Sequence, residues 1–104
     1  MHTGHGGFWA LEATGEFRVR TRNGSNAIAA PDAAPTFRIY IGATQTAALT
    51  GTGTGIVDSQ TGYYRTAPAL TSANGFTEGA VCRIEWTWAV SATNYGETQV
   101  FLIN

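Results

Sequence analysis

The chain has 104 residues, the length of a single domain, and a formal net charge of −1 at pH 7. Hydrophobic residues make up 43% of it and charged residues only 12%, which indicates a folded globular protein with a sparsely charged surface. All six basic residues are arginines, too few for the large basic patch that nucleic acid or an anionic membrane surface would require. Low net charge does little to keep copies apart, so the composition favours a chain that assembles with others.

Single residue types exclude further classes of protein. Cys82 is the only cysteine, which rules out an intrachain disulfide and a cysteine-based zinc site, and it is predicted to be a small buried hydrophobe. The first residues contain no apolar run preceded by positive charge, so no signal peptide is expected. No stretch approaches the roughly 18 apolar residues of a membrane helix.

Short runs of β-branched and aromatic residues, separated by glycines and prolines, predict an all-β chain of about seven strands. In chain order the runs are 7–13, 16–22, 36–41, 47–49 (a short edge strand), 56–58, 63–67, 80–92 and 97–103. Residues 1–7 are expected to form a flexible N-terminal arm of the single domain 1–104.

Alternation with period two assigns the faces of the strands, because successive side chains of a strand point to opposite sides. The residues predicted to face the core are Phe17, Val19, Phe37, Ile39, Ile41, Cys82, Ile84, Trp86, Trp88 and Val90. The opposite faces carry Arg18, Arg20, Arg38, Tyr40, Arg83, Glu85 and Thr87.

Turn-forming residues separate these strands. Asn23-Gly24 predicts a tight turn, 25–35 a loop, and Asn94-Tyr95-Gly96 the turn before the closing strand. The Gly-Thr repeat at 51–54 looks like low-complexity sequence.

The segment 70–79 differs from the rest of the chain. Thr71 or Ser72 can cap a helix and Gly75 can end it, so one short helical turn near 71–76 is expected, with Leu70 and Phe76 directed inward. Together with the strand spacing, this predicts a small two-sheet Ig-like β-sandwich; a small barrel is the alternative.

No catalytic machinery is apparent, and the chain is predicted not to be an enzyme and to need no cofactor or metal. His2 and His5 are the only histidines and lie on a glycine-rich terminus, whereas a metal site needs three or four convergent ligands. The carboxylates show no paired spacing; Asp58 is expected to cap a turn and Glu85 to pair with an arginine across the sheet. The glycines of 51–55 lack the Gly-Lys-Ser/Thr ending of a phosphate loop.

The aromatic residues and the arginines are the candidates for binding. A sugar-stacking surface could form from the aromatic residues Trp9, Trp86, Trp88, Tyr40, Tyr63, Tyr64 and Tyr95. Its expected place is Trp86 and Trp88, but these two continue the apolar face of their strand, which favours the core. The outward arginines could contact a protein partner or be solvated. The candidate partner-contact residues are Phe8, Trp9, Arg18, Arg20, Arg38 and Arg83, and Arg22 is a further outward arginine.

Residues 34–104 resemble a known family through a series of short motifs. These are Ala34-Pro35-Thr36-Phe37-Arg38-Ile39-Tyr40, Leu49-Thr50-Gly51, Val57-Asp58-Ser59-Gln60-Thr61-Gly62-Tyr63-Tyr64 and, most specifically, Leu70-Thr71-Ser72-Ala73-Asn74-Gly75-Phe76-Thr77-Glu78-Gly79. The chain is similar in these motifs to the small Ig-like virion structural proteins of tailed bacteriophages. The glycine-rich insert 52–55 and the strand Trp86-Thr87-Trp88 depart from the family pattern.

The resemblance implies a virion structural role without catalysis. The first expectation is a capsid decoration or cement protein on the virion surface, made in the host cytoplasm. Its partner would be the major capsid protein, and the chain would form a homo-oligomer or occur in multiple copies. A tail or baseplate component and a carbohydrate-binding module using Trp86 and Trp88 are the alternatives.

Overall fold

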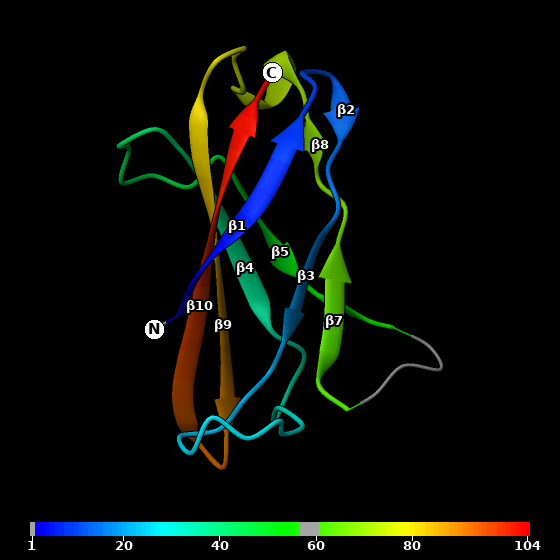
Figure 1. Cartoon of the computed structure of the whole chain (residues 1–104), viewed down its shortest axis with the longest axis vertical. Coiled ribbons are helices and arrows are strands. Elements are labelled where there is room, and N and C mark those ends of the chain that lie inside the picture. Colours follow the sequence, from blue (N-terminus) through cyan, green and yellow to red (C-terminus); the bar gives the residue numbers. More distant parts are fainter. Residues whose placement is uncertain (1, 57–60) are drawn as a thin grey trace.

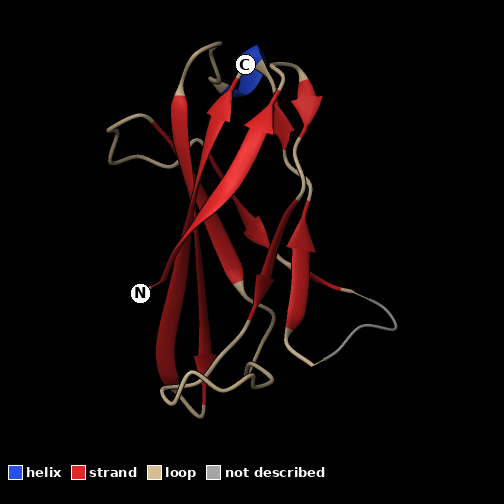
Figure 2. Cartoon of the chain, viewed as in Figure 1, coloured by secondary structure: helices blue, strands red, loops and turns tan. Residues whose placement is uncertain are grey.

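Strands form nearly all the regular structure of the computed structural model (Figure 2), which describes residues 2–56 and 61–104. For residues 2–6 only the backbone is described. One 3-10 turn, η1 (Ser72–Asn74), interrupts the strands, and the described residues contain no helix long and apolar enough to cross a membrane.

The larger sheet has five strands and runs along the whole molecule (Figure 1). Its order is β1 (His2–Trp9), β10 (Thr93–Ile103), β9 (Val81–Val90), β4 (Thr36–Ile41) and β5 (Leu49–Thr52). β1 pairs with β10 in parallel, and every other pair in this sheet is antiparallel.

The second layer consists of shorter strands. β3 (Phe17–Arg20), β7 (Tyr63–Thr66) and β6 (Thr54–Gly55) form a three-stranded sheet, and β2 (Ala13–Thr14) pairs with β8 (Ala69–Leu70) beyond it (Figure 1). A β3-β7-β6 layer facing β10-β9-β4 has the strand arrangement of immunoglobulin-type sandwiches. The prediction of a small Ig-like sandwich is therefore confirmed.

The core lies mainly where the sequence pattern predicts it, although Ile41 and Val90 are only half-buried. Tyr40, predicted for the opposite face, is 9% exposed because the Arg83 guanidinium covers its ring. The apolar face of β9 is buried, and the 3-10 turn lies over one end of the core, where Leu70 and Phe76 are both 0% exposed. Thr71 caps this turn by accepting from the Asn74 N–H, and Gly75 ends it with φ 94°. Each such large side chain contributes about 1.5–3 kcal/mol on burial, so this short segment is a substantial part of the core.

The Gly-Thr segment is a correction to the sequence prediction, because it forms two strands rather than low-complexity sequence. β5 belongs to the large sheet and β6 to the small one, so the chain changes sheets at Gly53. Gly53 is buried, and its N–H donates to the Pro35 carbonyl at 2.7 Å. The edge strand predicted at 47–49 is β5, which begins only at Leu49 and continues to Thr52.

The final hairpin also differs from the prediction. Asn94, Tyr95 and Gly96 lie within β10, and the turn is instead the pair Ser91-Ala92, with φ values of 51° and 67°. Two residues with positive φ define a type I′ hairpin turn, which normally requires Asn or Gly. The Asp32 carboxylate accepts hydrogen bonds from both turn N–H groups, at 2.9 and 2.8 Å. This distant carboxylate stabilises a turn that the local sequence does not favour.

The last two predictions to compare are the N-terminal arm and the strand 56–58. The expected arm is instead strand β1, because residues 2–9 pair with the edge of β10 and thereby satisfy backbone groups of both strands. Of the predicted strand 56–58, only Ile56 is described, and it lies outside any strand. Val57 and Asp58, with its expected turn cap, lie outside the described residues.

Candidate functional site

Glu12 and Cys82 contribute to the fold rather than to a shared chemical site. Among the described residues, no three His, Cys, Asp or Glu side chains come together as a metal site would require. The Glu12 carboxylate accepts from the Ser72 N–H at 2.8 Å, and this hydrogen bond lowers the pKa of Glu12. Burial raises the pKa of the Cys82 thiol, as expected for an inert core cysteine.

Trp86 and Trp88 do not form a sugar-stacking surface. Trp86 is 0% exposed and packs against Phe37, with ring centroids 5.4 Å apart. Trp88 is 8% exposed, and its indole N–H donates to the Arg22 carbonyl at 2.9 Å. Both rings face the core, so the prediction that these two tryptophans offer a surface for stacking sugars is wrong.

Phe8 and Trp9, the two aromatic contact candidates, lie at the end of β1 but differ in environment. Phe8 is 61% exposed. Trp9 is half-buried, and its ring centroid lies 5.8 Å from that of Phe17. Trp9 therefore anchors β1 to the core, while Phe8 presents an aromatic ring at the surface.

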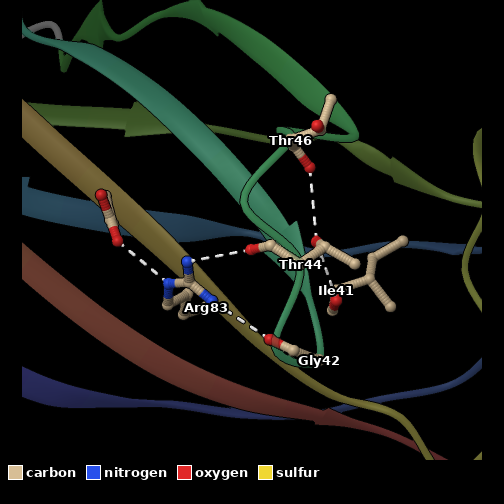
Figure 3. Close-up of polar contacts among 6 residues, drawn as sticks. Ile41, Gly42, Thr44, Thr46 and Arg83 are labelled. Carbon is tan, nitrogen blue, oxygen red and sulfur yellow. Dashed lines mark hydrogen bonds and ion pairs between the residues drawn. The ribbon is translucent and has the colours of Figure 1, made fainter.

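Arg83 stabilises the fold around the β4–β5 loop. Its guanidinium donates to the carbonyls of Gly42 and Thr44, at 3.1 and 3.3 Å (Figure 3), and lies 4.2 Å from the ring centroid of Tyr40. It also pairs with Glu85 at 3.0 Å. Glu85 lies directly opposite Arg38 on β4, as a cross-sheet arginine was expected to, but its ion pair is with Arg83, two residues away on its own strand.

Arg18 is likewise paired. The Glu16 carboxylate lies 3.1 Å from the Arg18 guanidinium and 3.7 Å from that of Arg65. The hydrogen bond and charge of Glu16 raise the pKa of Arg18. Arg18, Arg65 and Arg83 thus have carboxylate partners within the described residues, whereas Arg20, Arg22 and Arg38 have none.

Two of these three unpaired arginines line a groove of about 870 Å³. We call it the seam groove and define it by Arg20, Arg22, Asn23, Trp88, Tyr95 and Glu97. Its lining residues come from the end of β3 and the loop that follows it, and from β9 and the first half of β10. That loop and the β9–β10 hairpin lie at the same end of the sandwich (Figure 1). Arg38 is exposed and lies in the larger sheet, away from the groove.

The seam exists because the inner face of β10 changes from apolar to polar along the strand. Directly opposed residues share a face, so Tyr95 and Glu97, which pair with Trp88 and Trp86, occupy inward register positions. Gln99, the next inward residue, does not join the core; it donates to the Arg18 carbonyl on β3 at 2.7 Å and to Glu97 at 2.6 Å. The two layers are therefore joined by polar contacts at this side.

The sequence analysis found Arg20 as a candidate and noted Arg22 and the aromatic Tyr95, but it missed Glu97 and Gln99. The missed signal is the inward series Tyr95, Glu97, Gln99, Phe101 and Ile103, in which Glu97 and Gln99 stand where the strand pattern calls for apolar residues. We found no family model, no curated protein and no solved structure that matches this chain.

Proposed function

We propose that this chain is a virion structural protein of a tailed bacteriophage, most specifically a capsid decoration protein. It binds the outer surface of the capsid and stabilises the contacts between major capsid protein subunits. Its contribution is adhesive: area buried at the joins between subunits opposes the pressure of the packaged DNA.

The observation that carries the proposal is the role of the family-like motif 70–79. Leu70 and Phe76 are fully buried, and Thr71 and Gly75 cap the turn between them. The residues that resemble the bacteriophage family thus build the scaffold of an Ig-like sandwich. A shared scaffold supports a shared architecture, and the functional step rests on the resemblance.

The surface supports an adhesive role in a more general way. The described carboxylates Glu12, Asp32, Glu16 and Glu85 have structural partners, so they do not converge as an acid–base pair. A surface with few charges also loses little hydration when it is covered by a partner. These features suit a module that functions by being bound.

The test is the copy number of the protein in purified virions of a phage that encodes it. Quantitative mass spectrometry should find hundreds of copies per particle, and virions that lack the protein should release DNA at lower temperature. A handful of copies would instead assign the chain to the tail or baseplate. Absence from virions would contradict both assignments.

A further inference from the structure

We infer that the seam groove binds an extended, acidic segment of a partner protein, which adds to the free edge of β3. This deepens the proposed function, on which the identity of the partner rests, by naming the contact surface and its chemistry. Three features of the groove support it: an open strand edge, two arginines without a carboxylate partner, and a fixed shape.

The open edge is centred on the backbone of Arg20. In an antiparallel pair, successive residues alternate between facing the neighbouring strand and facing away. Thr21 faces β7, because its N–H donates to the Gly62 carbonyl at 2.9 Å. Arg20 therefore faces away from β7, toward the groove, as do the carbonyls of Arg18 and Arg22, which accept from Gln99 and Trp88.

The two flanking carbonyls are thus occupied, while Arg20 between them retains an N–H and a C=O for a partner strand. No described residue hydrogen-bonds to either group across this edge. A strand edge that is left open in this way accepts an extended segment through main-chain hydrogen bonds. Because only one residue is open, the backbone contact is short and side chains must supply most of the specificity.

The side chains that line the groove favour an acidic occupant. The Arg20 guanidinium lies 5.4 Å from the ring centroid of Tyr63 on β7 and donates from Nε to the Thr61 carbonyl at 3.4 Å. Arg22 donates from one nitrogen to the Asn26 carbonyl at 3.2 Å. Each guanidinium has five N–H donors, so both have donors left for a carboxylate. The one carboxylate in the groove, Glu97, already accepts from Gln99.

The shape of the groove is fixed before any partner arrives. Gln99 donates to Arg18 on β3 at 2.7 Å, and Trp88 donates to Arg22, two residues beyond the end of β3, at 2.9 Å. These two hydrogen bonds from the large sheet hold the walls of the groove at a set spacing. Asn23 accepts from the N–H groups of Ser25 and Ala27, which fixes the adjoining loop. A preformed site of this kind limits the ordering entropy lost on binding.

The first test uses the purified protein and a yeast-displayed library of random heptapeptides. Selected peptides should be enriched in Asp and Glu and should bind more weakly as salt increases. Arg22→Glu should weaken their binding at least about tenfold, since a charge-assisted hydrogen bond is replaced by repulsion. Arg38→Glu is the matched control, with the same change in charge outside the groove, and should change the affinity less than about twofold.

A structural measurement accompanies the selection. Hydrogen exchange at the Arg20 amide should slow when a selected peptide binds. The inference is overturned if no peptide is selected, if the selected peptides lack acidic residues, if Arg38→Glu weakens binding as much as Arg22→Glu, or if the Arg20 amide exchanges unchanged.

Virion occupancy then separates this inference from the proposed function. If particles carry the wild-type protein, Arg22→Glu should lower its occupancy and Arg38→Glu should not. Undiminished occupancy of the Arg22→Glu variant would refute the groove as the capsid contact while leaving the virion role intact. Absence of the wild-type protein from particles would refute the virion role, and the peptide selection would still decide the groove.

Discussion

Gly53, where the chain passes from the large sheet to the small one, should not tolerate even a methyl group. A Cβ at this position would lie 2.9 Å from Cζ3 of Trp86 and 3.3 Å from Cβ of Tyr64. Carbon atoms normally approach to about 3.5–4.0 Å, so the new methyl group would overlap the indole ring. Trp86 is fully buried and cannot retreat into solvent.

We therefore expect Gly53→Ala to lower the free energy of unfolding by about 1–3 kcal/mol, the usual penalty for an overpacked core. In a domain of this size, each kcal/mol shifts the melting temperature by about 4–8 °C. Urea denaturation followed by circular dichroism should show a lower midpoint with an unchanged slope, because the surface exposed on unfolding hardly changes.

The matched control is Gly55→Ala, two residues along the same segment. Its new Cβ would lie 3.7 Å from Cε2 of Tyr64, an ordinary van der Waals contact. This variant should stay within about 0.5 kcal/mol of the wild type, since both substitutions restrict the unfolded chain equally.

A second background identifies the clashing atom. Trp86→Phe removes the six-membered indole ring that contains Cζ3, and its lost indole N–H has no hydrogen-bond partner among the described residues. In this background Gly53→Ala should be less harmful, with a coupling energy of about 0.5–3 kcal/mol. Equal stability of Gly53→Ala and Gly55→Ala, or the same penalty in both backgrounds, would refute the argument.

Four further predictions concern the turns and the cysteine. Ala92→Gly should raise the free energy of unfolding, measured in urea, by up to about 1 kcal/mol, because Ala92 has a φ of 67°. Asp32→Ala should lower it by about 1–3 kcal/mol, because two turn N–H groups lose their acceptor. An Asp32→Ala variant as stable as the wild type would contradict this. Glu12→Gln should destabilise the protein at neutral pH, because the pKa of Glu12 is lowered in the folded state and its ionised form is therefore stabilising above the ordinary value of 4.5. The difference in stability between variant and wild type should shrink as the pH falls from 4.5 through the folded-state pKa. A difference that does not change with pH would count against this role of Glu12. Cys82 should react with a thiol reagent only as fast as the protein unfolds, and rapid labelling of the native protein would show that its burial is overstated.

The strands that could be predicted are those whose side chains alternate strictly. Phe37 and Ile39 in β4, and the apolar series of β9, are buried as their spacing requires. A one-residue shift in register would expose each series, so the pattern alone specifies which face is inside. The turn at 71–76 was predictable for a different reason, since Thr71 and Gly75 act through local hydrogen bonds and backbone conformation.

The elements that could not be predicted depend on residues distant in sequence. Ser91-Ala92 is a turn because Asp32, some 60 positions earlier, accepts from both of its N–H groups. The Gly-Thr segment passes between the sheets at Gly53, where a side chain would overlap Trp86. In both cases a tertiary contact overrides weak local preferences, which no local pattern contains.

The candidate site shows the same division. Outward arginines were predictable from alternation on β3, β4 and β9, but which of them are paired was not. Arg83 is held by a loop some 40 positions away, and Arg18 by a carboxylate two positions away. The distinction between structural and unpaired arginines appears only when the sheets are assembled.

The inward polar residues of β10 are the strongest argument that the seam is kept open rather than left imperfect. Glu97 and Gln99 occupy positions where apolar side chains would each contribute about 1.5–3 kcal/mol on burial, as Phe101 and Ile103 do further along the strand. Closing the seam with apolar side chains would also cover the backbone of Arg20. The protein lacks this apolar burial, yet Gln99 and Trp88 still join the two walls of the seam groove by hydrogen bonds. One strand edge therefore stays accessible at a fixed spacing. If the open seam serves a partner, replacing Glu97 and Gln99 together by leucine should make the protein more stable in urea and abolish binding of the selected acidic peptides. A variant that gains stability and still binds these peptides would show that the open seam serves no partner.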